Sequence, residues 1–219
     1  VTDKKCDAFV CGELVGASCQ AACPMDTEAW RYVALIEKGL YEEAYQVIRQ
    51  ANPFPSICAR VCDRKCEQRC QLGASGGEAV AIRALKRFVT DRVSPTVYKP
   101  PKIAKARGKS GKVAVIGAGP AGLTAAHYLS LLGHKVTLFE AEAEPGGMLM
   151  SCIPAYRLPR SILRPEIDSL LNDKITLRCS TKLGRDVTLD GLFDEGFKAV
   201  FLAMGADKSW TLDLPGENI

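Results

Sequence analysis

The sequence predicts a multidomain chain of class α + α/β, in which an all-helical N-terminal domain precedes an α/β domain. Residues 1–93 contain amphipathic segments with helical spacing, few strand-like runs and eight of the ten cysteines. From Lys112 onward the sequence instead alternates short apolar runs with a helical segment, as βαβ units do. We therefore expect a helical domain over 1–93, a linker over 94–111 and an α/β domain over 112–219.

Three longer helices are predicted in the N-terminal domain. In MDTEAWRYVALIEKGL, Asp26 or Thr27 is expected to cap the helix and Gly39 to end it. The next segment, YEEAYQVIRQANP, is stopped by Pro53. An amphipathic helix is expected from about Glu78 to Val93, after the cysteine-rich stretch and a glycine-rich turn.

The segment that follows, SPTVYKPPKIAKARGKSG, predicts a surface linker. Residues 94–112 hold three prolines, six basic side chains and no acidic ones, and they account for the net charge of +4. A nucleic-acid-binding face would show basic and reading side chains on a folded element, so we expect no nucleic-acid partner. There is no apolar signal region and no run long enough to span a membrane, so we expect a cytoplasmic protein.

The α/β domain begins with a βαβ unit that predicts a dinucleotide site. The run KVAVIGAG is a strand, PAGLTAAHYLSLLGH a helix and KVTLFEAE a second strand, and later apolar runs, ITLRC and KAVFLAMG, predict further strands. Between the first strand and the helix lies G-x-G-x-x-G, formed by Gly117, Gly119 and Gly122. These glycines permit a tight turn, close approach of a pyrophosphate and close packing of helix and sheet, respectively. Glu140 ends the second strand, where a carboxylate accepts hydrogen bonds from ribose hydroxyls.

The residues beyond this unit favour FAD. Glu140 suits a free 2′-hydroxyl, EPGGMLM supplies a double glycine at Gly146 and Gly147, and the last strand ends near Gly205. In these features the sequence resembles the two-dinucleotide flavoprotein oxidoreductases. The resemblance implies a Rossmann-like FAD-binding domain, of which residues 112–219 are the N-terminal portion.

The segment GGMLMSCIPAYRLPR narrows the resemblance to the small (beta) subunit of glutamate synthase and the flavin domain of dihydropyrimidine dehydrogenase. The residues then expected to contact FAD are Gly117, Gly119, Pro120, Ala121, Gly122, Glu140, Gly146, Gly147, Met148, Leu149, Arg157, Leu183 and Gly205. Cys152 departs from the family pattern and is interpreted as a substitution rather than a redox thiol. NAD(P)H is expected to bind only in the full-length protein, because relatives continue into a second Rossmann domain after the Pro-Gly near the C-terminus.

The stretch CARVCDRKCEQRC, from Cys58 to Cys70, has a cysteine at every fourth position. Such a pattern is open to several readings: disulfides, a zinc site, an iron–sulfur site or a packing stripe. The absence of an export signal argues against disulfides. The C-x2-C pairs usual for zinc are missing, and a Cys-Pro at Cys23 is typical of iron–sulfur proteins.

The motifs SCQAACP and NPFPSICARVCDRKCEQRC resemble the helical domain that carries two [4Fe–4S] clusters in the same family. The resemblance implies one cluster on Cys6, Cys11, Cys19 and Cys70, and a second on Cys23, Cys62 and Cys66. Relatives often use Gln or Glu as the eighth ligand, at a place that falls on Lys86 here. Since lysine is a poor ligand, Cys58 is one alternative, and an outside ligand or a three-iron form are others.

The implied function is an electron-transfer module of an iron–sulfur flavoprotein NAD(P)H oxidoreductase that passes electrons between FAD and two [4Fe–4S] clusters. Its expected partner is the remainder of its own polypeptide or another oxidoreductase subunit. No catalytic residue is nominated, because this traffic needs no acid–base pair. The alternative is a non-catalytic docking or scaffold module whose cysteine domain binds zinc or stays empty.

Overall fold

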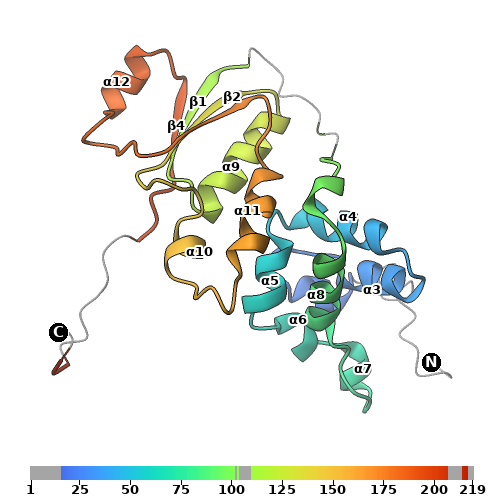
Figure 1. Ribbon diagram of the computed structural model, residues 1–219. Helices are drawn as coiled ribbons and strands as arrows, with labels where there is room; N and C mark the ends of the chain where they lie inside the picture. Colours follow the sequence, from blue (N-terminus) through green and yellow to red (C-terminus); the bar gives the residue numbers. More distant parts are fainter. Residues whose placement is uncertain (1–15, 102, 104–109, 207–213, 217–219) are drawn as a thin grey trace. The chain divides into compact units, whose positions relative to one another are not determined.

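The computed structural model describes residues 16–101, 103, 110–206 and 214–216 (Figure 1). The chain forms two compact units. Unit 1 comprises the described residues of Val1–Ala104 and Cys152–Asn172, and unit 2 those of Lys105–Ser151 and Asp173–Ile219. The predicted helical and α/β classes are both present. Residues 152–172, however, pack with the helices of unit 1.

Unit 1 is built from helices around one apolar core. The helices are α2 (Ser18–Ala21), α3 (Ala29–Glu37), α4 (Tyr41–Ala51), α5 (Pro55–Val61), α6 (Lys65–Gln68), α7 (Gln71–Ala74), α8 (Ile82–Arg92), the 3-10 turn η1 (Pro95–Val97) and α11 (Arg160–Asp168). Tyr32, Tyr45, Ile48 and Val89 are fully buried in this core, and they come from α3, α4 and α8. The apolar faces that the sequence pattern predicted therefore meet one another.

Two details of the helix predictions were wrong. Neither Asp26 nor Thr27 caps α3. Asp26 has a left-handed φ of 49°. The hydroxyl of the buried Thr27 instead accepts a weak hydrogen bond from Cys23 Sγ at 3.7 Å. Helix α8 begins at Ile82 rather than near residue 78. The side chain of Glu67 stabilises this start, since its Oε1 accepts a hydrogen bond from the Arg83 N–H at 2.8 Å.

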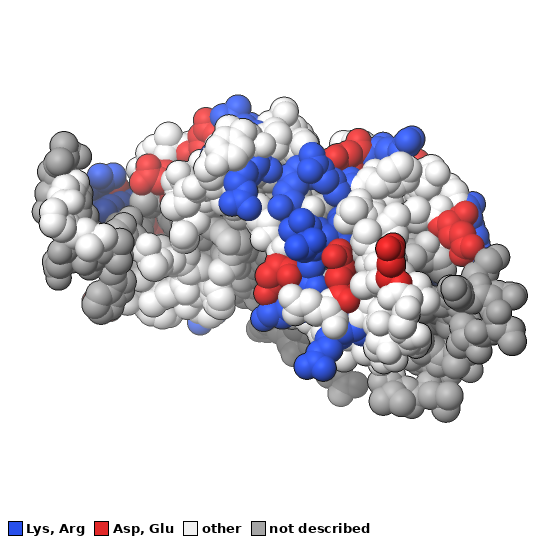
Figure 2. All heavy atoms as spheres, turned by 90° about the horizontal axis from the view of Figure 1, so that it is seen from below, with Lys and Arg blue, Asp and Glu red and all other residues white. Residues whose placement is uncertain are grey.

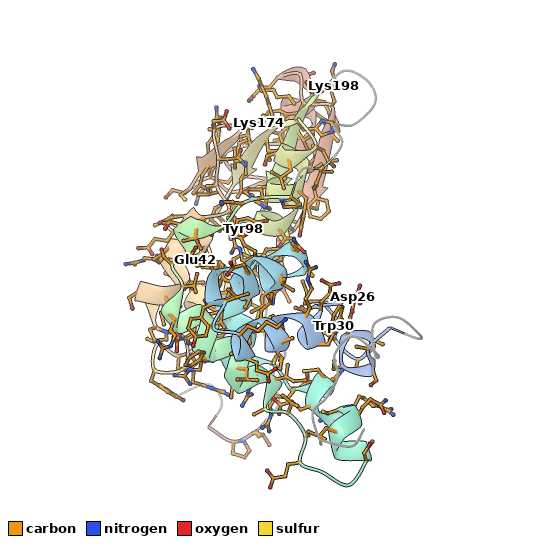
Figure 3. All side chains as sticks on the ribbon, turned by 90° about the vertical axis from the view of Figure 1, so that its right-hand side faces the viewer. Asp26, Trp30, Glu42, Tyr98, Lys174 and Lys198 are labelled. Carbon is orange, nitrogen blue, oxygen red and sulfur yellow. The ribbon has the colours of Figure 1, made fainter. Side chains whose placement is uncertain are left out.

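A buried polar network attaches α11 to unit 1. Arg49 on α4 donates to Ser169 Oγ at 3.0 Å, and its guanidinium stacks on the ring of Tyr98 at 4.0 Å. Figure 3 labels Tyr98. Glu166 on α11 is fully buried and accepts a hydrogen bond from the Ser56 N–H at 3.0 Å. Burial raises the pKa of this carboxyl to about 7. These long-range contacts explain why residues 152–172 group with the N-terminal helices.

Unit 2 contains a parallel sheet, β1 (Lys112–Ile116), β2 (Lys135–Phe139), β3 (Ile175–Arg178) and β4 (Ala199–Leu202), with helices α9 (Pro120–Leu131), α10 (Met148–Ser151) and α12 (Leu189–Asp194). The strand order is β3-β2-β1-β4, and every pairing is parallel. From β1 the chain first builds outward through β2 and β3 and then returns to the opposite side of β1 with β4. Such a reversal is the topological switch point at which doubly wound folds bind their ligands, and it confirms the predicted Rossmann-like class.

Two further observations concern the surface. Figure 2 shows Lys and Arg side chains gathered near the middle of the face it presents, with acidic side chains beside them. None of the helices in the described part of the chain is both long and apolar enough to cross a lipid bilayer.

Candidate functional site

The glycine loop lies at the carboxyl end of β1. Gly117 has a φ of 101°, and Gly119 is the N-cap of α9, whose first residue is Pro120. The Gly117 N–H donates to the Phe139 carbonyl at 2.7 Å, which ties the loop to β2. Helix α9 has twelve residues and begins directly after the loop. Its free N-terminal N–H groups and the positive end of its dipole therefore lie at the end of the loop, as an anion-binding site requires.

Three of the predicted glycines, Gly117, Gly122 and Gly147, make backbone contacts too close for a Cβ. A Cβ on Gly122 would lie 1.8 Å from the Gly117 carbonyl oxygen, and one on Gly117 would lie 2.4 Å from the carbonyl oxygen of Ala203. A Cβ on Gly147 would lie 2.9 Å from the Gly119 Cα. The double glycine therefore packs backbone to backbone on the glycine loop. A Cβ on Gly119, by contrast, would meet nothing nearer than Gly147 Cα at 3.9 Å.

Glu140 holds the loop in place. This residue is 7% exposed, and both of its carboxylate oxygens accept backbone hydrogen bonds, Oε2 from the Ala118 N–H at 2.6 Å and Oε1 from the Glu142 N–H at 2.9 Å. The predicted contact of Glu140 with ribose stays a prediction. A carboxylate has further lone pairs, so binding a ribose hydroxyl and holding the loop are compatible.

The other residues expected to contact FAD are distributed as follows. Ala121 is in the first turn of α9, Met148 and Leu149 open α10 after the double glycine, and the Gly146 N–H donates to the Ala118 carbonyl at 2.8 Å. Leu183 forms an isolated parallel bridge with Val187 beyond β3, and Gly205 follows β4 with a φ of 70°. Within unit 2, the double glycine and Glu140 thus both contact the glycine loop.

Arg157 belongs to unit 1. There it lines a groove of about 720 Å³ together with Arg60, Arg87 and Tyr156. Arg60 forms an ion pair with Asp91, and Arg87 pairs with the same carboxylate at 3.3 Å. The expected contact of Arg157 with the flavin stays a prediction.

The cysteine-rich stretch is broken into short helices and is not one continuous helix. Cys58 lies within α5, and Cys62 follows its end in an extended conformation. Arg64 then takes a left-handed φ of 60° before α6, which contains Cys66. These breaks release the four thiols from a single helical stripe. They can consequently face two different places.

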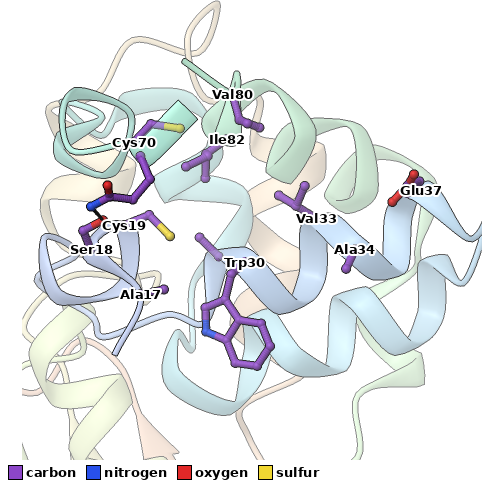
Figure 4. A pocket seen from close by; sticks show the side chains of 12 residues that line it. Ala17, Ser18, Cys19, Trp30, Val33, Ala34, Glu37, Cys70, Val80 and Ile82 are labelled. Atoms are coloured by element: carbon purple, nitrogen blue, oxygen red, sulfur yellow. Dashed lines mark hydrogen bonds between the residues drawn. The ribbon is translucent and has the colours of Figure 1, made fainter. Parts of the chain in front are cut away.

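One group of thiols consists of Cys19 and Cys70. Both line a largely apolar pocket of about 80 Å³ between α2, α3 and the start of α7, together with Trp30, Val33 and Ile82 (Figure 4). Burial raises the pKa of the Cys19 thiol, and the nearby charge of Cys70 adds to this rise. Cys6 and Cys11, the other predicted ligands of this cluster, lie outside the described residues.

The second group consists of Cys23, Cys58, Cys62 and Cys66. Burial raises the pKa of Cys66 to about 11; Lys86 opposes this rise, while Cys23 and Cys62 increase it. Burial also raises the pKa of Cys58, which interacts with Lys86, Cys62 and Cys23 as well. Charges on Cys23 and Cys62 thus act on both Cys58 and Cys66, and Lys86 acts on Cys23, Cys58 and Cys66.

Cys23 differs from its neighbours in this group. Burial works to raise its pKa, but hydrogen bonds with the backbone of Thr27 and Met25 and with the Thr27 side chain lower it overall. A thiol whose pKa is lowered in this way loses its proton to solvent more readily, and the thiolate is the form that binds a metal.

Tyr32 lies between the two thiol groups. Its hydroxyl donates to the Ile82 carbonyl at 3.3 Å, and its ring is fully buried. Burial raises the pKa of Tyr32 well above the ordinary value, and the charges of Cys66, Cys23, Cys19 and Cys62 raise it further. Cys19 of the first group and Cys66 of the second both pack against the core that contains Tyr32, whereas the two cluster sites themselves stay a prediction.

The donor set fits iron–sulfur clusters. Soft thiolates in a partly buried, weakly polar pocket are the usual ligands of [4Fe–4S] clusters. Among the residues that the structure describes, no three His, Cys, Asp or Glu side chains lie close enough together to hold a single metal ion. The four thiolates of a cluster each bind a different iron and so stand farther apart than the ligands of one ion.

Three contributors to these sites carry no recognisable sequence signal. Glu67 caps α8 beside Cys66, Arg83 donates from Nη1 to the Cys62 carbonyl at 2.9 Å, and Asn52 lies beside Cys58. Glu67 and Arg83 contact residues far from them in sequence, and Asn52 precedes the helix that contains Cys58. A glutamate, an arginine or an asparagine in a helical domain does not by itself predict such a contact.

Comparison with known proteins supports the predicted domain type of both halves of the chain. Residues 2–96 match the family described as dihydropyrimidine dehydrogenase domain II, 4Fe-4S cluster, and residues 111–219 match the pyridine nucleotide-disulphide oxidoreductase family. The chain is 38% identical over 224 residues to an NADP(+)-dependent formate dehydrogenase subunit beta of Moorella thermoacetica, covering 93% of this chain and 31% of that protein.

Two other relatives match to a similar degree. An NADPH-Fe(3+) oxidoreductase subunit beta of Geobacter sulfurreducens is 37% identical over 204 residues, covering 92% of this chain and 30% of that protein. An NAD-dependent dihydropyrimidine dehydrogenase subunit PreT of Escherichia coli is 38% identical over 202 residues, covering 90% of this chain and 48% of that protein. The chain thus spans between about a third and a half of the length of these relatives. It belongs, domain by domain, to the dihydropyrimidine dehydrogenase domain II, 4Fe-4S family and then to the pyridine nucleotide-disulphide oxidoreductase family.

Proposed function

We propose that this chain is the electron-transfer module of an iron–sulfur flavoprotein oxidoreductase, and that it passes electrons between FAD and two [4Fe–4S] clusters. The observation that carries the proposal is the sorting of six described cysteines into two adjacent groups, in a chain whose second unit has a dinucleotide-type glycine loop at its switch point. One cluster alone would leave one of these groups without a role.

The protein's contribution is to bind and to set energies. When bound, FAD exchanges a hydride with a nicotinamide and the clusters carry single electrons. The loop N–H groups and the α9 N-terminus would hold the pyrophosphate, while Glu140 keeps the loop in its conformation. In unit 1, Cys19 and Cys70 would hold the first cluster with Cys6 and Cys11, and Cys23, Cys62 and Cys66 would hold the second. Burial and the nearby Lys86 charge set the reduction potentials.

We also propose that further protein completes unit 2, as part of the same polypeptide or as a partner subunit that brings the NAD(P)H site. In the described part of the sheet, β4 pairs on one side only, with β1. Phe201, Leu202 and Met204, in and just after β4, are 44%, 51% and 57% exposed. Apolar side chains at an open sheet edge favour cover by another segment.

The proposal does not single out glutamate synthase. The three relatives described above carry names with three different reactions, those of a formate dehydrogenase, an Fe(3+) oxidoreductase and a dihydropyrimidine dehydrogenase. What they share in these names is a redox reaction with a nicotinamide cofactor. We therefore assign the shared electron-transfer role to this chain and leave the terminal acceptor to the protein that it serves.

The test is to place electrons on the flavin and follow them. Anaerobic protein loaded with FAD is photoreduced, and absorption is recorded at the flavin band and near roughly 400 nm, where iron–sulfur clusters absorb. We expect cluster absorption to bleach together with the flavin. The Cys62→Ala variant should lose about half of the cluster bleaching and keep the flavin change. Bleaching of the flavin with no change in a cluster band would contradict the proposal.

A further inference from the structure

The groove of about 720 Å³ in unit 1 is strongly basic. Among the described residues that line it, the charged ones are four arginines, Arg60, Arg87, Arg92 and Arg157, and one carboxylate, that of Asp91. We propose that this groove is a docking site for an acidic segment of the protein that exchanges electrons with this chain. The binding surface does not depend on bound iron, whereas the identity of its occupant as a redox partner rests on the proposed function.

Asp91, on α8, orients two of these arginines. Its carboxylate accepts a hydrogen bond from Arg60 Nη2 on α5 and pairs with Arg87 Nε at 3.3 Å. The Arg60 side chain is only 5% exposed, and its Nη1 donates to the Ser56 carbonyl at 3.0 Å, so this guanidinium is fixed in the groove. The Arg87 side chain is 61% exposed and stays accessible to a ligand. Because one carboxylate serves two guanidiniums, the pairing leaves a net positive charge.

Arg92 and Arg157 add positive charge that no carboxylate offsets. Neither of them forms an ion pair with any residue that the structure describes. The guanidinium carbon of Arg92 lies 4.4 Å from the centre of the Phe88 ring, and such stacking orients the group without neutralising it. The arginines of α5 and α8 suffice for the proposed site, whether or not Arg157 contacts the flavin.

This arrangement favours an extended acidic ligand over one small anion. A small oxyanion binds where several donors converge, and at the point where Arg60 and Arg87 converge the carboxylate of Asp91 already lies. The other accessible charges are spread along the groove. Arg87 and Arg92 are five residues apart on α8, which corresponds to about 7.5 Å along the helix axis. Charges spaced in this way match successive carboxylates of a protein segment.

Tyr156 adds an apolar contact surface beside these charges. This residue is 86% exposed, whereas aromatic side chains are mostly buried. Pro159, Ile162 and Pro165 line the groove as well. Tyrosine and arginine are enriched where proteins bind one another, and apolar side chains occupy the centre of such interfaces. The groove therefore suits a protein segment that combines carboxylates with an apolar anchor.

The test measures binding of a fluorescein-labelled peptide of glutamates and one leucine to the full chain, by fluorescence anisotropy. We expect saturable binding that weakens as salt is added, and no binding of a peptide in which lysines replace the glutamates. The double variant Arg87→Glu/Arg92→Glu should bind the acidic peptide about tenfold more weakly or worse. Arg31→Glu/Lys38→Glu, at exposed positions in and just after α3, changes the net charge equally and should keep wild-type affinity.

The outcomes separate this inference from the proposed function, because iron is counted on the same samples. Iron-loaded wild type that does not bind the acidic peptide would overturn the docking site alone, whereas peptide binding by a zinc protein would contradict the proposed function alone. Equal weakening in both double variants, or displacement of the peptide by FAD or inorganic phosphate at constant ionic strength, would also overturn the docking site. If the glutamate variant does not fold by circular dichroism, Arg87→Gln/Arg92→Gln decides: weaker binding supports the site, and unchanged binding contradicts it.

Discussion

Two alanine substitutions in the glycine loop should separate its structural role from its binding role. In Gly122→Ala the new Cβ would lie 1.8 Å from the Gly117 carbonyl oxygen, far inside van der Waals contact. The obstacle is backbone, which cannot rotate away as a side chain can. In Gly119→Ala the nearest atom outside the neighbouring residues is Gly147 Cα at 3.9 Å, which is an ordinary contact.

The expected sizes follow from these contacts. Forcing a methyl group into a closely packed site costs about 1–3 kcal/mol, and alanine recovers up to about 1 kcal/mol of helix propensity at position 122. Because 1 kcal/mol shifts Tm by about 2–4 °C in a chain of this size, Gly122→Ala should lower the Tm of the flavin-free protein by several degrees. Gly119→Ala should change that Tm little. It should still weaken FAD binding at least tenfold, about 1.4 kcal/mol, because the second glycine of this motif is the one expected to let the pyrophosphate approach the backbone.

The assay measures both quantities on the same samples. Tm is taken from circular dichroism of the flavin-free protein, and FAD affinity from the change in flavin fluorescence on titration. A Gly122→Ala protein as stable as the wild type would refute the packing argument. Tight FAD binding by Gly119→Ala, at wild-type affinity, would refute the assignment of this loop to the pyrophosphate.

Three further substitutions have defined outcomes. In Glu140→Gln, one of the two backbone N–H groups faces an amide donor instead of a carboxylate acceptor. The free energy of unfolding, measured by urea denaturation, should fall by about 1–3 kcal/mol. An unchanged midpoint would contradict the role of Glu140 in holding the loop. Lys86→Gln should lower the reduction potential of the second cluster, because removing a nearby positive charge disfavours the added electron. Lys65→Gln, on an exposed lysine of α6, is the control. Equal potentials in all three proteins would contradict the placement of Lys86. Burial raises the pKa of the Glu166 carboxyl from 4.5 to about 7, so its stabilising effect is complete below pH 4.5 and is lost as the pH rises through about 7. The Tm of Glu166→Gln should therefore rise relative to that of the wild type between pH 5 and pH 8. A Tm difference that stays constant over this range would show that Glu166 does not titrate in it.

Much of unit 2 could be predicted because its determinants are local in sequence. The apolar runs at β1 and β2 and the glycines between them specify a strand, a turn and a helix over about thirty residues. Gly117 has the positive φ of a tight turn, as the sequence suggested, and a Cβ at Gly117 or Gly122 would in addition meet backbone of Ala203 or Gly117. The second role of Glu140, as the acceptor that holds Ala118, needs the loop geometry and could not be read from the spacing.

Unit 1 was predicted in outline but not in detail. The amphipathic patterns located α3, α4 and α8, whereas the start of α8 depends on Glu67, fifteen residues before the helix. The breaks around Cys62 and Arg64 decide which thiols meet, and no residue there is a glycine or proline that would announce them. The attachment of residues 152–172 to this unit depends on the buried side chains of Arg49 and Glu166, whose partners lie more than one hundred residues away in sequence.

The claim on which all other conclusions depend is that the thiols of unit 1 bind iron and sulfide. Elemental analysis of the anaerobically purified chain, with sulfide and flavin counted on the same sample, tests it most directly. The predicted result is about eight irons and eight labile sulfides per chain, together with FAD when the flavin is supplied. Stoichiometric zinc without iron or labile sulfide would contradict the claim and identify the helical unit as a zinc-binding or docking module.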